Sequence, residues 1–274
     1  MGFSTLPSRM AWRYLRSKKS HSAVGAISMT SICGMAVATA AIICVLSVFN
    51  GFQSVIAGRL DTLSPDVLVT PAKGKTIADG EGTAKRVLAV DGVELSTPTI
   101  SDNALALYNG REMPVLLKGV DPDAYAQVTS VRSLIIHDNS GRFLTKDAVR
   151  PEGTISIGVA SQLGAFPDDR FLIFAPRREG RVNLANPLAS FITDSITVSG
   201  VFRTDQSDYD TDHLIVDLAT ARRLFSYDTQ ASAIEVKARK GVDAATLAGR
   251  IGAELGPDYV VKDRMRQQEM NFRM

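Results

Sequence analysis

The sequence has 274 residues, of which 45% are hydrophobic and 22% charged, with a formal net charge of +2. This balance gives no support to a nucleic-acid partner, since such a partner would require clustered Lys and Arg. The chain has two cysteines, Cys33 and Cys44, which lie eleven positions apart in one apolar run. A disulfide framework and a zinc site are therefore not expected.

Residues 1–22 carry five basic side chains before the first apolar run: Arg9, Arg13, Arg16, Lys18 and Lys19. Leu6, Met10 and Leu15 can share the opposite face of a helix. We predict an amphipathic helix here. The positive-inside rule places it in the cytoplasm and places the chain beyond about residue 52 outside.

The run from Ser22 to Gly58 contains no Lys, Arg, Asp or Glu. Residues 23–52 are long enough to cross a bilayer, since about 20 apolar residues suffice. Small residues at four-residue spacing favour close helix packing in lipid, and those assigned to packing are Gly34, Ala36, Ala38 and Ala40. We predict a packed transmembrane helix. A simple anchor and a cleaved signal peptide remain alternatives, although the run is long for a signal peptide.

The helix is expected to continue outside the membrane as a stalk over residues 53–65, which Ser64-Pro65 ends. Residues 66–262 alternate between strand and helix patterns, so we predict one continuous α+β domain and leave open whether it has two lobes. The predicted elements include strands at Asn103–Tyr108 and Ala233–Ala238 and a helix at Leu218–Phe225. Asn109-Gly110 between two strands indicates a type I′ hairpin turn. Residues 263–274 begin a last helix.

Three patterns resemble ligand-binding or catalytic motifs, but each lacks residues at the required positions. Gly74-Lys75-Thr76 lacks the earlier glycine of a phosphate-binding loop. A calcium loop starting at Asp208 would require glycine where His213 stands. The three histidines are scattered and suggest no nucleophile–base pair. We predict no catalytic residue, metal site or cofactor.

One long segment between two predicted strands combines basic and apolar side chains. A loop with charged and apolar anchors is suited to binding a partner. The residues assigned to this docking loop are Pro176, Arg177, Arg178, Arg181, Pro187 and Phe191. The alternative is an ordinary solvated hairpin.

Several segments together resemble a known family. They are Arg13-Tyr14-Leu15, Lys18-Lys19, the run from Val45 to Phe52, the strand Ser199–Phe202 and the acidic loop Asp205–Asp212 with the strand and helix that follow. In this order they are similar to LolC/LolE-type lipoprotein-releasing permeases, of the MacB/FtsX-like class of ABC transporter membrane subunits. The resemblance covers nearly the whole chain, and its first block is the most specific.

The resemblance implies a bacterial inner-membrane subunit with a cytoplasmic N-terminus and a periplasmic domain of the MacB-like core type. It implies a separate ATPase, a second permease copy or paralogue, a lipoprotein cargo and a periplasmic carrier that docks on the loop at residues 176–191. The subunit itself would not be an enzyme. Within this hypothesis, we assign contact with the acyl chains of the lipoprotein to Val45, Val48, Phe49 and Phe52, near the outer end of the helix, and we expect membrane lipid as a further partner.

The family also has three further membrane helices, so residues 263–274 would lead towards a second span and the chain would be part of a longer subunit. Two other functions remain open. One is a signal-anchored periplasmic binding or scaffolding protein. The other is a related permease for efflux or for control of a cell-wall hydrolase.

Overall fold

The computed structural model describes residues 22–60, 63–136, 141–146, 148–177 and 191–271, together with Met10 and Arg13. The chain divides into two compact units, residues 1–58 and residues 59–274. Each unit is described by itself.

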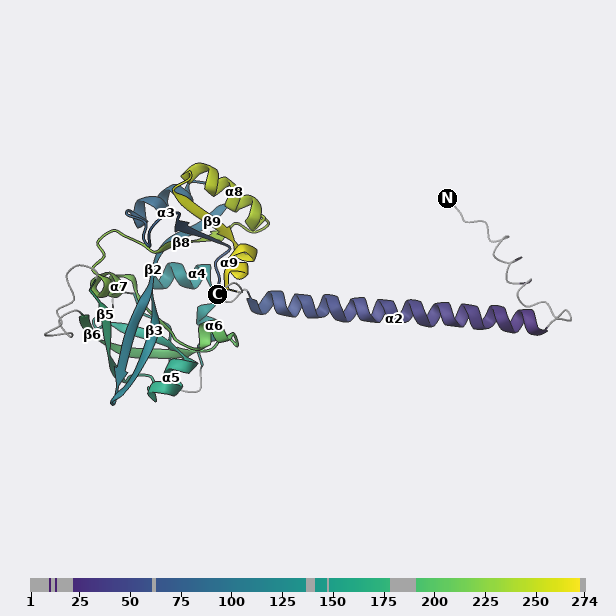
Figure 1. Ribbon diagram of the computed structural model, residues 1–274, viewed down its shortest axis with the longest axis horizontal. Helices are drawn as coiled ribbons and strands as arrows, with labels where there is room; N and C mark the ends of the chain where they lie inside the picture. The colour runs from purple at the N-terminus through teal and green to yellow at the C-terminus, as the bar shows by residue number, and fades with distance from the viewer. Residues whose placement is uncertain are drawn as a thin grey trace. The chain divides into compact units, whose positions relative to one another are not determined.

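The first unit contains helix α2, Ser22–Leu60, which Figure 1 shows as an unbroken helix. At 1.5 Å per residue, its 39 residues extend about 58 Å, well beyond the ~30 Å of a bilayer core. Within it, Ile27–Gly51 is apolar and long enough to cross a membrane. The Ser31 and Thr39 hydroxyls donate to the carbonyls of Ile27 and Met35, so these polar groups are satisfied within the helix. The expected long apolar helix is confirmed.

The second unit contains a small antiparallel sheet with strand order β2-β8-β1-β9. Two β-α-β units form it, and helices α3 and α8 contribute to an apolar core with its strands. Their bounds are β1 Val67–Pro71, α3 Gly80–Leu88, β2 Val93–Tyr108, β8 Ala233–Ala238, α8 Ala244–Leu255 and β9 Tyr259–Asp263. This arrangement is the ferredoxin-like split β-α-β pattern.

The chain between β2 and β8 forms a closed barrel, to which the second half of β2 also belongs. Its strands pair in the ring β2-β3-β7-β4-β6-β5 and back to β2. The added strands are β3 Arg111–Val120, β4 Glu152–Ser156, β5 Arg170–Pro176, β6 Phe191–Phe202 and β7 His213–Asp217. Side chains from all six strands fill the interior, together with α5, Ile157–Leu163, and α7, Leu218–Phe225.

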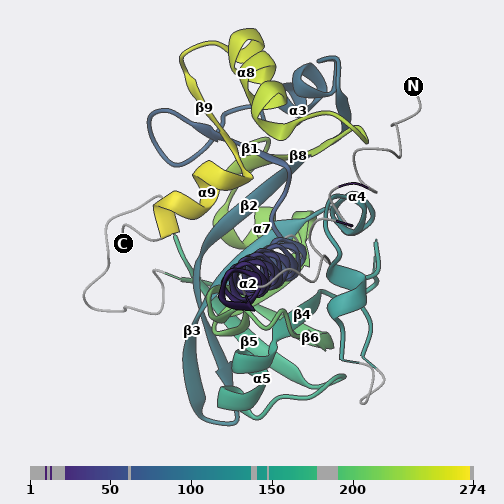
Figure 2. The same cartoon turned by 90° about the vertical axis from the view of Figure 1, so that its right-hand side faces the viewer.

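The long strand β2 joins the two sheets. Residues Val93–Thr99 pair with β8 in the small sheet, and Ile100–Tyr108 pair with β3 in the barrel. Figure 2 shows β2 running from one sheet into the other. The two sheets therefore share a covalent backbone but have separate apolar cores.

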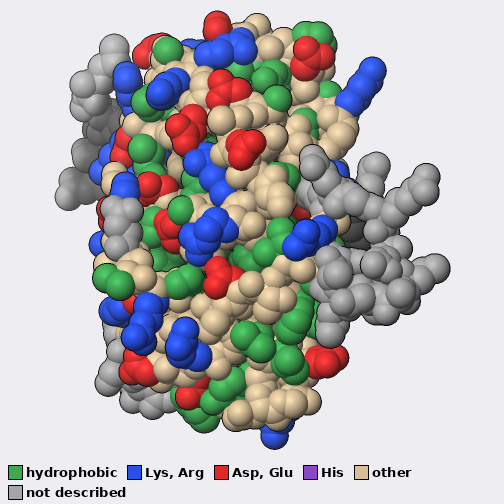
Figure 3. Space-filling view, turned by 90° about the vertical axis from the view of Figure 1, so that its left-hand side faces the viewer, with side chains coloured by type: hydrophobic (Ala, Val, Ile, Leu, Met, Phe, Trp, Pro, Cys, Tyr) green, Lys and Arg blue, Asp and Glu red, His purple; other side chains and the backbone are tan. Residues whose placement is uncertain are grey.

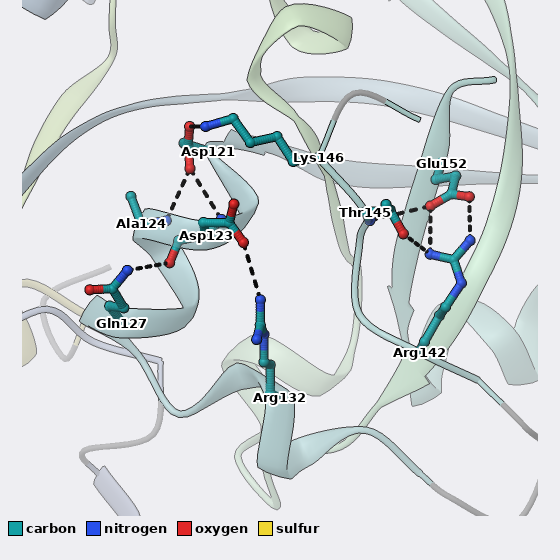
Figure 4. A network of polar contacts seen from close by, with 9 residues as sticks. All are labelled: Asp121, Asp123, Ala124, Gln127, Arg132, Arg142, Thr145, Lys146 and Glu152. Carbon is teal, nitrogen blue, oxygen red and sulfur yellow. Dashed lines mark hydrogen bonds and ion pairs between the residues drawn. The ribbon is translucent and has the colours of Figure 1, made fainter. Parts of the chain in front are cut away.

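Helix α4, Pro122–Val128, follows β3 and is capped by Asp121 (Figure 4). One Asp121 carboxylate oxygen accepts from the Asp123 and Ala124 amides, and the other forms an ion pair of 3.0 Å with Lys146. Burial by itself raises the pKa of Asp121, but these hydrogen bonds and Lys146 lower it below its usual value. A short 3₁₀ helix, Val131–Leu134, comes next.

Most predicted elements of the second unit are confirmed. The Asn109-Gly110 turn has φ values of 48° and 76°, as a type I′ turn requires. Helix α9, Arg264–Asn271, begins directly after Asp263, as predicted. Helix α4, the 3₁₀ helix and α6, Ser207–Asp210, were not predicted. The fold class is confirmed as a mixed α/β domain preceded by one apolar helix.

Candidate functional sites

The small residues of α2 lie on two opposite faces of the helix. At about 100° per residue, Gly34 and Ala38 share one face, whereas Ala36 and Ala40 lie roughly 180° away. A Cβ built on Gly34 would meet no atom within 4 Å. The proposed packing sites are therefore two surfaces rather than one.

The residues predicted to contact acyl chains share one face with Gly34 and Ala38. Val45, Val48 and Phe49 are all exposed, at 67%, 73% and 55%. The backbone of Phe52 continues this face, but its side chain lies outside the described residues. From Gly34 to Phe52, this helix face changes from small to bulky residues.

The predicted docking loop begins and ends at the hairpin of β5 and β6. Pro176 and Phe191 are paired partners at the end of these strands. Pro176 and Arg177 are exposed and Phe191 is half-buried. Arg178, Arg181 and Pro187 lie outside the described residues. The structure therefore fixes the base of the loop at the hairpin.

Apolar side chains lie on the outer face of the barrel next to this hairpin. Phe174 of β5 pairs with Leu105 of β2, and Leu172 pairs with Leu107. Leu172 is 40% exposed, and the other three are partly exposed. Figure 3 shows hydrophobic side chains gathered on the lower part of this face of the molecule, over the barrel.

Two segments of the second unit, one near its start and one near its end in the sequence, are held together. Strands β1 and β9 pair from Val67 opposite Asp263 onwards. Arg264 forms an ion pair of 2.9 Å with Asp66, and the Gln267 side-chain amide donates to the Pro65 carbonyl at 3.4 Å. We call residues 63–66 and 264–267 the junction.

The junction is anchored in the domain by Leu63 and Ser64. Leu63 is 2% exposed and belongs to an apolar cluster with Tyr125, Phe202 and Ile215. The Ser64 hydroxyl lies 3.1 Å from the Tyr209 hydroxyl. These contacts fix the start of the second unit to its apolar interior.

His213 of β7 lies beside the junction, with its ring 5.2 Å from that of Tyr209. Burial lowers the pKa of His213, and the charge of Lys118 lowers it further. The neighbouring carboxylate of Asp212, 3.1 Å from Nδ1, acts in the opposite direction but does not reverse the shift. The imidazole is therefore neutral at neutral pH.

Three carboxylates of the acidic loop 205–212, those of Asp205, Asp210 and Asp212, contact residues that flank the loop. Asp210 accepts hydrogen bonds from the Thr204 amide and hydroxyl, and Asp205 pairs with Arg203 at 2.8 Å. Within the described ranges, no group of three or more His, Cys, Asp or Glu side chains could hold a metal ion.

Sequence reasoning missed the junction. The pairing of Asp66 with Arg264 joins positions about 200 residues apart, and neither residue belongs to a recognisable motif. The only sequence signal was the Ser64-Pro65 helix stop immediately before a strand.

Comparison with known proteins places these features in context. Residues 28–254 match the family model of the MacB-like periplasmic core domain. A lipoprotein-releasing system transmembrane protein LolC of Neisseria meningitidis is 28% identical over 91% of this chain, and one of Xylella fastidiosa is 26% identical over 97%. A LolE protein of Haemophilus influenzae is 26% identical over 84%. The chain spans only 54% to 62% of the length of these relatives.

Two solved structures share the fold. The extracellular domain of the ABC-type transporter YknZ from Gram-positive bacteria superposes with a TM-score of 0.51 at 15% identity, covering 73% of this chain and 99% of that one. The periplasmic region of MacB from Actinobacillus actinomycetemcomitans gives 0.51 at 12% identity, covering 76% and 92%.

Proposed function

Since the chain belongs to the family of the MacB-like periplasmic core domain, we propose that it acts in an ABC transporter as a permease that extracts lipoproteins from the bacterial inner membrane. A separate ATPase supplies the energy, and a second permease, either a copy or a paralogue, completes the membrane part. A soluble periplasmic carrier receives the lipoprotein. The chain transmits motion and catalyses no reaction itself.

The observation that carries this proposal is the extent of the match to relatives named for lipoprotein release. The match to the LolC proteins covers 91% and 97% of the chain. The likeness to YknZ and MacB supports the fold alone, because the identities are 15% and 12%. The cargo is therefore proposed from the sequence relatives.

The geometry of the second unit suits this role. The chain enters through residues 63–66 and leaves through 264–267, and the Asp66–Arg264 ion pair holds these segments together. A displacement of the membrane helices would thus be applied to the domain at one place. The helix face with Val45, Val48 and Phe49 offers bulky apolar side chains for an acyl chain. The hairpin ending in Pro176 and Phe191 offers the carrier a docking point.

The test is ATP-driven release in a defined membrane. The protein is purified from its native membranes with the ATPase that accompanies it and reconstituted with a fluorescent triacylated lipoprotein. We expect transfer of the lipoprotein to a soluble carrier with ATP and none with a non-hydrolysable analogue. The same lipoprotein without acyl chains is the control. ATP hydrolysis without any lipoprotein transfer would refute the proposed cargo.

A second candidate is a related permease for efflux or for control of a cell-wall hydrolase, because the fold, which the extracellular domain of the ABC-type transporter YknZ shares, does not fix the cargo. This candidate predicts that small molecules or a hydrolase partner stimulate the associated ATPase and that lipoproteins do not. Purification without any ATPase would instead favour an anchored periplasmic scaffold.

A further inference from the structure

A lysine and a glutamate are buried against each other where the barrel meets the small sheet. Lys118 lies on β3 of the barrel, and Glu235 lies on β8 of the small sheet. Their Nζ and Oε1 atoms are 2.6 Å apart, and the side chains are only 14% and 3% exposed. Burying charge is costly unless it is paired, so each side chain requires the other in place.

Tyr125 is the third member of this cluster. Lys118 donates a hydrogen bond of 3.2 Å to the Tyr125 hydroxyl, and its Nζ lies 4.7 Å from the centre of the ring. Burial raises the pKa of Tyr125 to about 12, so the phenol stays protonated. Burial would lower the pKa of Lys118, but the charge of Glu235 raises it above its ordinary value. The lysine is therefore charged at neutral pH.

The cluster is not arranged for greatest stability. One oxygen of Glu235 contacts Lys118 and lies 3.5 Å from the Thr99 hydroxyl, whereas Oε2 is buried and finds no hydrogen-bond partner among the described residues. Apolar residues of similar size often replace such buried pairs at no cost in stability. An ion pair, unlike an apolar contact, has a preferred distance and direction. This favours a role in fixing the position of β3 relative to β8.

The cluster lies at a position where it can fix the barrel relative to the small sheet. Tyr125 lies on α4, which contacts β2 and β8 and shares an apolar cluster with Leu63 of the junction. A more exposed link in the same unit is the Arg222–Glu81 ion pair from α7 to α3, in which Glu81 is 57% exposed. The buried cluster thus lies between the junction, the small sheet and the barrel.

We propose that Lys118, Glu235 and Tyr125 are positioning residues that hold the barrel in one orientation on the small sheet. Through them, a displacement applied at the junction moves the barrel and its β5–β6 hairpin as one body. The use in transport rests on the function proposed above, whereas the fixed orientation does not.

The experiment measures the distance between two spin labels, one on each sheet's part of the full-length chain in detergent. The two native cysteines are first replaced by Cys33→Ala and Cys44→Ala. Labels are then attached after Leu88→Cys on α3 and Glu112→Cys on β3, both exposed positions. Pulsed electron spin resonance gives the distribution of distances.

The informative variant is the pair Lys118→Met and Glu235→Met, which removes both charges and leaves no unpaired ion. We expect its distance distribution to become at least twofold broader than that of the parent, with an unchanged unfolding temperature. The matched control, Arg222→Met with Glu81→Met, removes the exposed ion pair and is expected to leave the distribution unchanged. A parental distribution in the Lys118/Glu235 variant would overturn the proposal.

Tyr125→Phe tests the same proposal by the same distance measurement if the double variant does not fold. It keeps the buried ring and removes only the hydroxyl that accepts from Lys118. We expect a smaller broadening in the same direction, and an unchanged distribution refutes the proposal. Neither measurement requires the ATPase or a lipoprotein. A failure of the release assay would therefore refute the proposed function without affecting this inference.

Discussion

Leu63 offers the sharpest test of how the junction is anchored. Its side chain is 2% exposed in a cluster with Tyr125, Phe202 and Ile215. Truncating a buried leucine to alanine costs about 2–5 kcal/mol, through lost burial and the cavity left behind. For a domain of this size, 1 kcal/mol corresponds to roughly 2–4 °C in the unfolding midpoint. At about 3 kcal/mol, Leu63→Ala should therefore lower the midpoint by roughly 6–12 °C.

Differential scanning calorimetry of the full chain in detergent measures this shift. The matched control is Leu88→Ala on α3, because Leu88 is 46% exposed and its truncation should cost less than about 1 kcal/mol. If Leu63→Ala shifts the midpoint no further than Leu88→Ala, Leu63 does not anchor the junction and the reasoning is wrong.

Four further predictions concern single residues. Asp121→Ala should destabilise the domain by about 1 kcal/mol, because a helix N-cap is lost. Denaturant unfolding measures the difference in stability between the parent and this variant. Because the pKa of Asp121 is lowered in the folded state, the difference is present at neutral pH and disappears as the pH falls below about 4. The parent should lose stability below about pH 6.5, because His213 binds a proton more readily in the unfolded chain than in the folded one. His213→Gln should lose less stability over the same pH range, and an unchanged pH profile contradicts this. Phe49→Asp should lower ATP-driven lipoprotein release at least tenfold, whereas Ala36→Ser, on the opposite face, should leave it near normal. Arg177→Glu should weaken carrier binding several-fold by titration calorimetry, whereas Lys240→Glu, outside the loop, should not; equal effects exclude a specific role for Arg177.

The sequence predicts local elements well where pattern and turn chemistry agree. Helix α7, Leu218–Phe225, and strand β8, Ala233–Ala238, have the predicted bounds. Helix α4 was missed because it has only seven residues and depends on the Asp121 cap and on packing against β2 and β8. The long strand β2 was predicted only from Asn103, since its first half, Val93–Thr99, is recognisable as a strand only when β8 pairs with it.

The closed barrel could not be predicted, because closure depends on pairings distant in sequence. Strand β2 meets β5 about 65 residues later, and β3 meets β7 about 100 residues later. The same holds for the candidate sites. The proposed docking hairpin and the long apolar helix are continuous segments, for which sequence patterns can make a prediction. The pairs Asp66–Arg264 and Lys118–Glu235 join distant positions, and no local signal marks them.

The proposed contact between helix α2 and the acyl chains of lipoproteins is tested most directly by crosslinking in living cells. A photoreactive phenylalanine analogue at position 49 would be activated by light, and the captured molecules would be identified by mass spectrometry. The account predicts triacylated lipoproteins on position 49, with much less capture from the same analogue at position 43, where the exposed Ile43 lies on the opposite face. Capture of phospholipid alone at both positions, in cells that contain an active transporter, would contradict it.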